Sequence, residues 1–116
     1  MGTPTDPTPT LQRLAAFLGS TGVALGALGA HALQSRLTGT KLESWKTAVL
    51  YQLVSATALL GIQNEKAGQL IAVGCTMFSG SIYCLCLDIG PKKLLGPTTP
   101  LGGLCMIAGW VWLGFN

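Results

Sequence analysis

Four long uncharged stretches dominate this chain, because all eleven of its formally charged side chains lie outside them. The stretches cover residues 14–35, 47–64, 67–87 and 94–116, which amounts to 22, 18, 21 and 23 residues. A helix needs about 20 predominantly apolar residues to cross a bilayer core of ~30 Å. The pattern predicts an all-α integral membrane protein, a bundle of four transmembrane helices joined by short loops.

A soluble four-helix bundle is the alternative, and its helices would carry a charged face opposite each apolar stripe. Here 9% of the residues are charged and 49% are hydrophobic, and the four stretches are apolar on all sides. A membrane location therefore explains the pattern better. The second stretch is the weakest, because Thr47, Gln52, Ser55 and Thr57 dilute its hydrophobicity.

The domain organisation follows from the same pattern. Residues 1–10 hold three prolines and four threonines, a composition that resists helix formation and predicts a disordered tail. Residues 11–116 are expected to form one four-helix transmembrane domain, with spans at about residues 14–33, 47–63, 68–87 and 98–115.

The charges in the loops predict an orientation. With four spans, both termini lie on one side together with Arg13 and Lys66, and the other side carries five cations. The positive-inside rule then places both termini outside. The net charge of +3 suits an anionic lipid surface better than nucleic acid. The candidates for contact with lipid headgroups are Arg36, Lys41, Lys92 and Lys93.

Small residues predict where the helices pack. Glycines recur every three or four residues in the first stretch and occur as a pair in the fourth, and in a membrane such residues let two helix backbones approach closely. These glycines are Gly19, Gly22, Gly26, Gly29, Gly102 and Gly103. The spacing favours packing within the chain over a dimer, and a homo-oligomer stays open.

Tryptophans and prolines give predictions for the ends of the helices. Trp45 at one membrane face, and Trp110 with Trp112 at the other, fit interfacial anchors. The loop of residues 34–46 alternates apolar and charged side chains, so we expect a short interfacial helix broken at Gly39. The segment 96–103 is typical of a helix start, with Thr98 or Thr99 as the N-cap and Pro100 in the first turn.

The cysteines and acids make no catalytic set. All four cysteines lie inside expected spans, and Cys84 and Cys86 point about 200° apart around a helix, so they do not share a metal ion. No carboxylate lies in any expected span, and one histidine alone makes neither a metal site nor a proton relay. We expect no cofactor and no enzymatic activity.

Polar side chains from four segments lie near one membrane face, the face with the basic loops. One polar cluster is the simplest prediction, with His31 at a depth where it can hydrogen-bond Gln52 or Tyr83. The expected members are His31, Tyr51, Gln52, Ser79, Ser81, Tyr83 and Thr99. The cluster either fixes the register of the helices, which we favour, or binds a proton, a headgroup or a solute.

The same segments resemble the transmembrane protein 256 family of small inner-membrane proteins, which has no settled activity. The shared pattern runs Gly-Ala-His, then Trp-x-Thr-Ala-x-x-Tyr-Gln, then Phe-Ser-Gly-Ser-x-Tyr, then Gly-Pro-x-Thr-Pro-x-Gly-Gly and a late Gly-Trp. The residues that carry it are His31, Trp45, Thr47, Ala48, Tyr51, Gln52, Phe78 to Ser81, Tyr83, Gly96, Pro97, Thr99, Pro100, Gly102, Gly103, Gly109 and Trp110. One departure is Ser55, where the family commonly has a second histidine. The resemblance implies the four-helix membrane fold and, from its eukaryotic members, a mitochondrial inner-membrane location.

The function predicted from these observations is structural. We expect an accessory subunit that packs with lipids and other membrane protein subunits in a larger inner-membrane assembly, such as a mitochondrial respiratory-chain complex. In a prokaryote the location would be the bacterial inner membrane. The alternative is a small homo-oligomeric transporter or lipid-binding protein that uses His31, Gln52 and Tyr83.

Overall fold

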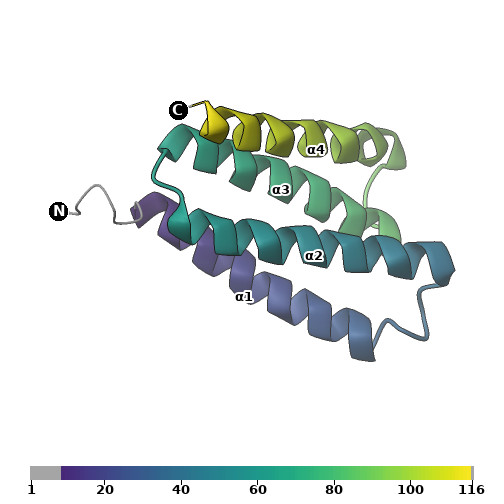
Figure 1. Cartoon of the computed structure of the whole chain (residues 1–116). Coiled ribbons are helices and arrows are strands. Elements are labelled where there is room, and N and C mark those ends of the chain that lie inside the picture. Colours follow the sequence, from purple (N-terminus) through teal and green to yellow (C-terminus); the bar gives the residue numbers. More distant parts are fainter. Residues whose placement is uncertain (1–8, 116) are drawn as a thin grey trace.

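The computed structural model describes residues 9–115, and these form four helices. The helices are α1 (Pro9–His31), α2 (Gly39–Gly61), α3 (Glu65–Cys86) and α4 (Lys92–Gly114). Each helix runs antiparallel to the one before it, so the start of α1 and the end of α4 lie at one end of the molecule (Figure 1). The loops from α1 to α2 and from α3 to α4 lie at the other end, which we call the basic end because it carries Arg36, Lys41, Lys92 and Lys93.

Three of these helices, α1, α3 and α4, are long and apolar enough to cross a membrane. α2 is as long as α1 and α4, with 23 residues, but its first third contains Lys41, Glu43 and Lys46. These charges lower its hydropathy, in addition to the polar side chains that dilute the second stretch of the sequence. The all-α fold with four helices is confirmed, and three of the four expected spans are found by length and composition.

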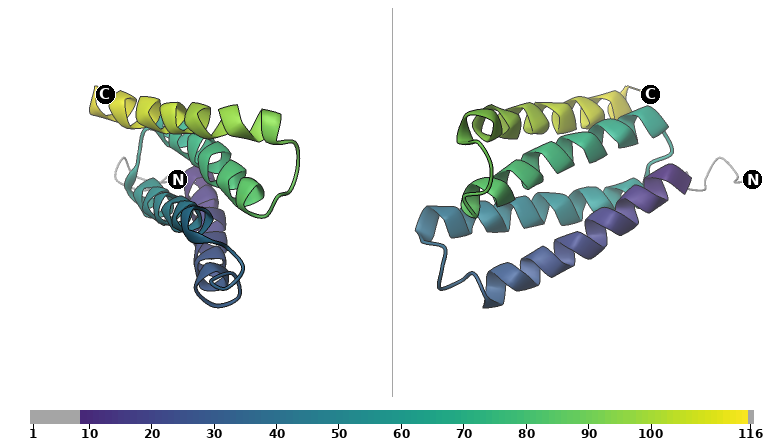
Figure 2. Two further views of the ribbon diagram at one scale, coloured as in Figure 1. Left: turned by 90° about the vertical axis from the view of Figure 1, so that its right-hand side faces the viewer. Right: turned by 180° about the vertical axis from the view of Figure 1, so that it is seen from behind.

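α3 is the central helix of the bundle. It packs along α2 and along α4, and it approaches α1 at only a few positions, while α1 packs mainly on α2. Within residues 9–115, the backbone of α4 makes no close contact with that of α1 or α2. The end-on view in Figure 2 shows α4 on the far side of α3 from α1. The bundle is therefore open between α2 and α4.

The glycine stripe of α1, which was predicted to pack on another helix of the chain, faces α2. Its members are Gly19, Gly22, Gly26 and Gly29. A β-carbon added at Gly29 would lie 2.6 Å from the ring of Trp45, so only glycine leaves room for that ring. Side chains of α2 thus fill the notches that the glycines leave, and the stripe is used inside the chain.

Backbone contacts join α3 to α4 still more closely. A β-carbon added at Gly102 would lie 2.5 Å from the backbone nitrogen of Phe78, and one added at Gly74 would lie 2.6 Å from the backbone nitrogen of Met106. Gly103, which was predicted to pack in the same way, is different, because its added β-carbon would make an ordinary contact of 3.7 Å with the Phe78 ring. Gly102 and Gly74 therefore let these two helices touch, as does Gly109, whose added β-carbon would lie 3.0 Å from the backbone nitrogen of Ile71.

The boundaries of α2 correct the prediction of an interfacial helix. α2 begins at Gly39 and continues without a break, so Trp45 belongs to it. The preceding loop packs on the bundle, because Leu33 and Leu37 are buried in one cluster with Trp45 and Ile82. The predicted disordered tail, residues 1–10, lies outside the described residues except for its last two, which are helical.

The start of α4 is also earlier than predicted. α4 begins at Lys92, which overturns the predicted N-cap at Thr98 or Thr99. Pro97 and Pro100 lie inside the helix, where each removes one backbone donor. The hydroxyl of Thr98 donates to the carbonyl oxygen one turn earlier, at 2.6 Å.

Candidate functional site

Gln52 of α2 is the centre of a polar network inside the bundle. Its side-chain amide donates to the carbonyl oxygen of Leu18 at 2.9 Å and to the hydroxyl of Thr21 at 2.7 Å. Its side-chain oxygen accepts a hydrogen bond from the hydroxyl of Tyr83 at 2.7 Å. Gln52 is 4% exposed. These bonds tie α1, α2 and α3 together at a buried position.

The other polar residues of the predicted cluster lie in separate contacts. Ser79 donates to a backbone carbonyl oxygen of α2 at 2.7 Å. Ser81 and Thr99 share a short hydrogen bond between α3 and α4. Tyr51 is exposed and stacks on Phe78 with their ring centroids 5.0 Å apart. The structure therefore brings together Gln52 and Tyr83 of the predicted cluster, while the serines, Thr99 and Tyr51 form separate interhelical links.

His31 belongs to none of these links, so its predicted place beside Gln52 is wrong. It is exposed and is the last residue of α1. The register of the helices explains this, because Gly22 faces Gln52 and Gly29 faces Trp45. At 1.5 Å per residue, His31 lies about 13 Å beyond the level of Gln52.

Trp45 is a core residue, which corrects its prediction as an interfacial anchor. It is 1% exposed, and its ring N–H donates to the carbonyl oxygen of Leu25 at 2.9 Å. Its ring lies 4.7 Å from the ring of Tyr83, measured between centroids. Trp45 thus joins three helices. Trp110 and Trp112 are exposed near the end of α4, and their anchoring role stays a prediction.

We expect the Gln52 network to contribute measurably to stability. Interhelical hydrogen bonds in membranes average about 0.6 kcal/mol each, so Gln52→Leu should lower the free energy of unfolding by about 2 kcal/mol through the loss of three bonds. Tyr83→Phe removes one of them and should cost about 0.6 kcal/mol. Denaturant titration of the protein in bicelles measures both values. Equal losses in the two variants would show that Gln52 is not the centre of the network.

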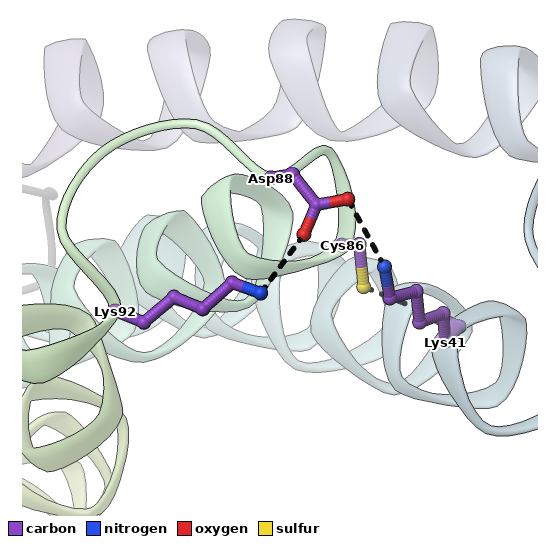
Figure 3. A network of polar contacts seen from close by, with 4 residues as sticks. All are labelled: Lys41, Cys86, Asp88 and Lys92. Atoms are coloured by element: carbon purple, nitrogen blue, oxygen red, sulfur yellow. Dashed lines mark hydrogen bonds and ion pairs between the residues drawn. The ribbon is translucent and has the colours of Figure 1, made fainter.

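The basic end contains an acid that holds two lysines, one on α2 and one on α4 (Figure 3). The Asp88 carboxylate lies 3.3 Å from Lys41 Nζ and 3.4 Å from Lys92 Nζ. The hydrogen bond and charge of Lys41, and then those of Lys92, lower the pKa of Asp88 below its usual value. Asp88 therefore stays ionised near neutral pH. Arg36 and Lys93, the other predicted headgroup residues, are exposed at this end.

The backbone turn after α3 positions that acid. Asp88 has a positive φ of 56°, a conformation that aspartate tolerates because its short side chain bonds locally. The amide of Ile89 donates to the carbonyl oxygen of Cys84 at 2.8 Å, as in the Schellman turn that ends many helices. The thiol of Cys86 donates to the carbonyl oxygen of Lys41 at 3.3 Å, so α3 and the start of α2 are also joined beneath the acid (Figure 3).

The cysteines are all free thiols. Cys75 and Cys86 are buried, and Cys84 and Cys105 are partly buried. Within the described part of the chain, no group of histidine, cysteine and acidic side chains is arranged to hold a metal ion. The expectation that the protein works without a cofactor stays a prediction.

Two hollows lie on the open side of the bundle, between α2 and α4. The first, of about 540 Å³, is at the basic end, and the second, of about 440 Å³, lies farther along the same two helices. The walls of the first include Lys41, Ser44, Ile82, Leu85 and Pro100. The walls of the second include Leu50, Val54, Ile107 and Trp110.

Three of these features were not predicted from the sequence: Thr21 in the Gln52 network, Gly74 at the α3–α4 contact, and the hollows. Thr21 carried a signal, since it lies beside Gly22 of the stripe that faces α2. Gly74 carried a weaker one, a lone glycine in an apolar helix. The hollows left no signal, because they arise from the distance between α2 and α4.

Comparison with known proteins supplies the remaining observations. Residues 25–103 match the family model described as a protein of unknown function (DUF423). A UPF0382 membrane protein of Schizosaccharomyces pombe is 38% identical, over 87% of this chain and 95% of its own length. One of Staphylococcus aureus is 40% identical, over 78% and 80%. A UPF0382 inner membrane protein of Escherichia coli K12 is 34% identical, over 83% and 79%. No solved structure is significantly similar.

Proposed function

The chain belongs to the DUF423 family of small membrane proteins, and from this premise we propose that it is a non-catalytic accessory subunit of a larger inner-membrane assembly. The observation that carries the proposal is the complete pairing of its interior polar groups. Every buried side-chain nitrogen and oxygen within the described residues has a hydrogen-bond partner. Both the amide and the oxygen of the Gln52 side chain are hydrogen-bonded to neighbouring helices.

This pairing argues against a transport or catalytic role for the polar residues. Intramembrane polar groups that bind a solute must face a cavity or a partner site. Here they hold helices in register, and His31 lies apart from Gln52 and Tyr83. The alternative of a small homo-oligomeric transporter or lipid-binding protein that uses these three residues therefore has less support.

The outer face of α4 is the surface that we assign to the partner. α4 packs on α3 alone, and the side turned away from α3 carries large exposed apolar side chains. These are Leu101, Leu104 and Val111, with Phe115 just past the end of the helix. An apolar helix face with neighbouring small residues suits the packing of another transmembrane helix.

We also infer that α2 is the fourth span. α1 and α3 run in the same direction (Figure 1), so a chain that crosses the membrane in both must return between them, and α2 is the connection. The basic end then faces the cytoplasm or the mitochondrial matrix. The Escherichia coli relative is an inner membrane protein by name, which supports an inner-membrane location, and for a eukaryotic member we propose the mitochondrial inner membrane. We take the transmembrane protein 256 group to be the eukaryotic branch of this family.

A photocrosslinking experiment tests the accessory role. A photoreactive residue at Leu104, on the outer face, should crosslink to one or a few defined polypeptides in intact membranes. The matched control is Cys105, whose thiol donates to the carbonyl oxygen of Leu70 on α3 at 3.3 Å, so that position should crosslink within the chain. Native gels of gently solubilised membranes should show the same partners in stoichiometric amounts. Migration as an isolated small oligomer, with no crosslinks from Leu104, would overturn the proposal.

A further inference from the structure

The open side of the bundle forms a groove with an apolar floor and a basic mouth. Its two hollows, of about 540 and 440 Å³, lie in line between α2 and α4. The stacked rings of Tyr51 and Phe78 stand between them, since Phe78 lines the first hollow and Tyr51 lines the second. From Lys41 to Val54 the groove follows α2 for about 20 Å at 1.5 Å per residue.

The first hollow combines two kinds of wall. Along α3 its wall is apolar, from Phe78 toward the middle of the bundle through Ile82 to Leu85 near the basic end. Toward the basic end, the wall along α2 carries the hydroxyl groups of Thr40 and Ser44 and the ammonium group of Lys41. One molecule that fills this hollow would therefore meet hydrocarbon along α3 and, at the basic end, hydrogen-bond donors with positive charge.

The mouth of the groove has a net positive charge. Lys41 and Lys92 share the single acid Asp88, so these three side chains carry one net positive charge. Both lysines keep much of their surface exposed, 45% for the side chain of Lys41 and 73% for that of Lys92. Exposed ion pairs of this kind are weak, so both ammonium groups are able to bind a further anion.

We propose that the groove binds one anionic phospholipid. Its phosphate lies at the mouth, against Lys41 and the hydroxyls of Thr40 and Ser44, and its acyl chains run over Ile82 and Phe78 into the second hollow. Basic pockets between transmembrane helices on the cytoplasmic or matrix side suit anionic headgroups. The length of the groove, about 20 Å, also covers one leaflet of a bilayer core whose full thickness is ~30 Å.

The shape of the groove favours a lipid over a transmembrane helix of a partner. A helix with its side chains is about 10–12 Å across, and it needs a continuous surface, whereas the Tyr51–Phe78 pair interrupts the groove. Flexible acyl chains pass on either side of such a pair. An apolar partner helix would also leave the charges at the mouth without a function. This inference uses the groove, and the accessory role uses the outer face of α4, so the two fail or succeed separately.

Native mass spectrometry of the detergent-solubilised protein tests the charge at the mouth. Phosphatidylglycerol and phosphatidylcholine with identical acyl chains are the two probes, and the protein should retain phosphatidylglycerol severalfold better. Lys41→Gln should weaken phosphatidylglycerol binding about five-fold, given the usual effect of one lysine near an anionic headgroup. Lys66→Gln, which removes the same charge at the opposite end of the bundle, should leave binding unchanged.

Asp88→Asn separates binding from stability. Asparagine tolerates the same left-handed turn, and its neutral side chain frees both lysines, so this variant should bind phosphatidylglycerol more tightly than the wild type. If Lys41 and Asp88 mattered only because their ion pair stabilises the fold, both substitutions would weaken binding. Opposite directions support the headgroup site, and equal directions overturn it.

A large side chain placed in the first hollow tests whether the acyl chains of the lipid lie in the groove. Ser44→Phe places a ring in the groove and should reduce the retention of both lipids, while Thr57→Phe, at an exposed position of α2 outside both hollows, should not. Equal retention of the two lipids by the wild type would overturn the proposal. So would a co-purifying polypeptide that crosslinks to Ser44, because the groove would then hold a protein.

Discussion

Gly102→Ala is expected to separate α4 from α3. The added β-carbon would lie 2.5 Å from the backbone nitrogen of Phe78 and 2.7 Å from the carbonyl oxygen of Gly74, and backbone atoms have no rotamer by which to move away. Overpacking of a well-packed site costs typically 1–3 kcal/mol and occasionally more. Because α3 is the only one of the described helices that α4 contacts, we expect a loss of about 3 kcal/mol or more.

Gly103→Ala is the matched control for this prediction. It adds the same methyl group one residue along, where the nearest atom is the Phe78 ring at 3.7 Å, so its effect should stay within about 0.5 kcal/mol. Maleimide labelling of Cys105, which faces α3 through its bond to Leu70, reports on the separation directly. Labelling should be fast in Gly102→Ala and slow in the control. Similar rates in both variants would mean that the helices do not touch at Gly102.

Trp45→Ala is expected to be the second severe change. Truncation of a buried tryptophan to alanine costs about 3–5 kcal/mol in protein cores, and here it also removes the hydrogen bond to Leu25. Trp110→Ala, on an exposed tryptophan of α4, should cost less than about 1 kcal/mol. Unfolding of both variants in bicelles measures the difference. If both variants lost little and similar free energy of unfolding, Trp45 would act as an interfacial anchor and not as a core residue.

A double substitution tests the fit between Trp45 and Gly29. Alone, Gly29→Ala should destabilise the protein, because its β-carbon would lie 2.6 Å from the Trp45 ring. In the Trp45→Ala background the same change meets empty space and should be neutral or stabilising. This change of sign is a coupling between two residues that a general loss of helix packing does not produce.

The number of helices and one of their packing faces could be predicted from the sequence alone. The exclusion of charge from four long stretches is a strong constraint, since a charged side chain in hydrocarbon is costly. The stripe from Gly19 to Gly29 was equally informative, because small residues at helical spacing have one common use in a membrane. α2 was the weakest of the four predicted spans, and it is the one described helix that is not apolar enough to count as a membrane span by length and composition.

The register between the helices could not be predicted from the sequence. A stripe that repeats every three or four residues packs almost as well when it slides by one turn, so nothing in the stripe itself placed Gly22 opposite Gln52. His31 was consequently predicted at the wrong depth. Trp45 shows a related limit, because an amphipathic ring serves an interface and a buried notch equally well. Gly29 lies opposite Trp45 and leaves room for its ring, and this is why the ring is buried and not at the interface.

The single attachment of α4 has a consequence for the biosynthesis of the protein. Because α4 is made after α1, α2 and α3 and, among these helices, contacts only α3, the first three already have all their mutual contacts when it enters the membrane, and its docking disturbs none of them. The same property makes α4 the helix that two copies of the chain exchange at the lowest cost, since one interface breaks and an identical one forms. Domain swapping through the loop of residues 87–91 is thus the route to a dimer that this architecture favours.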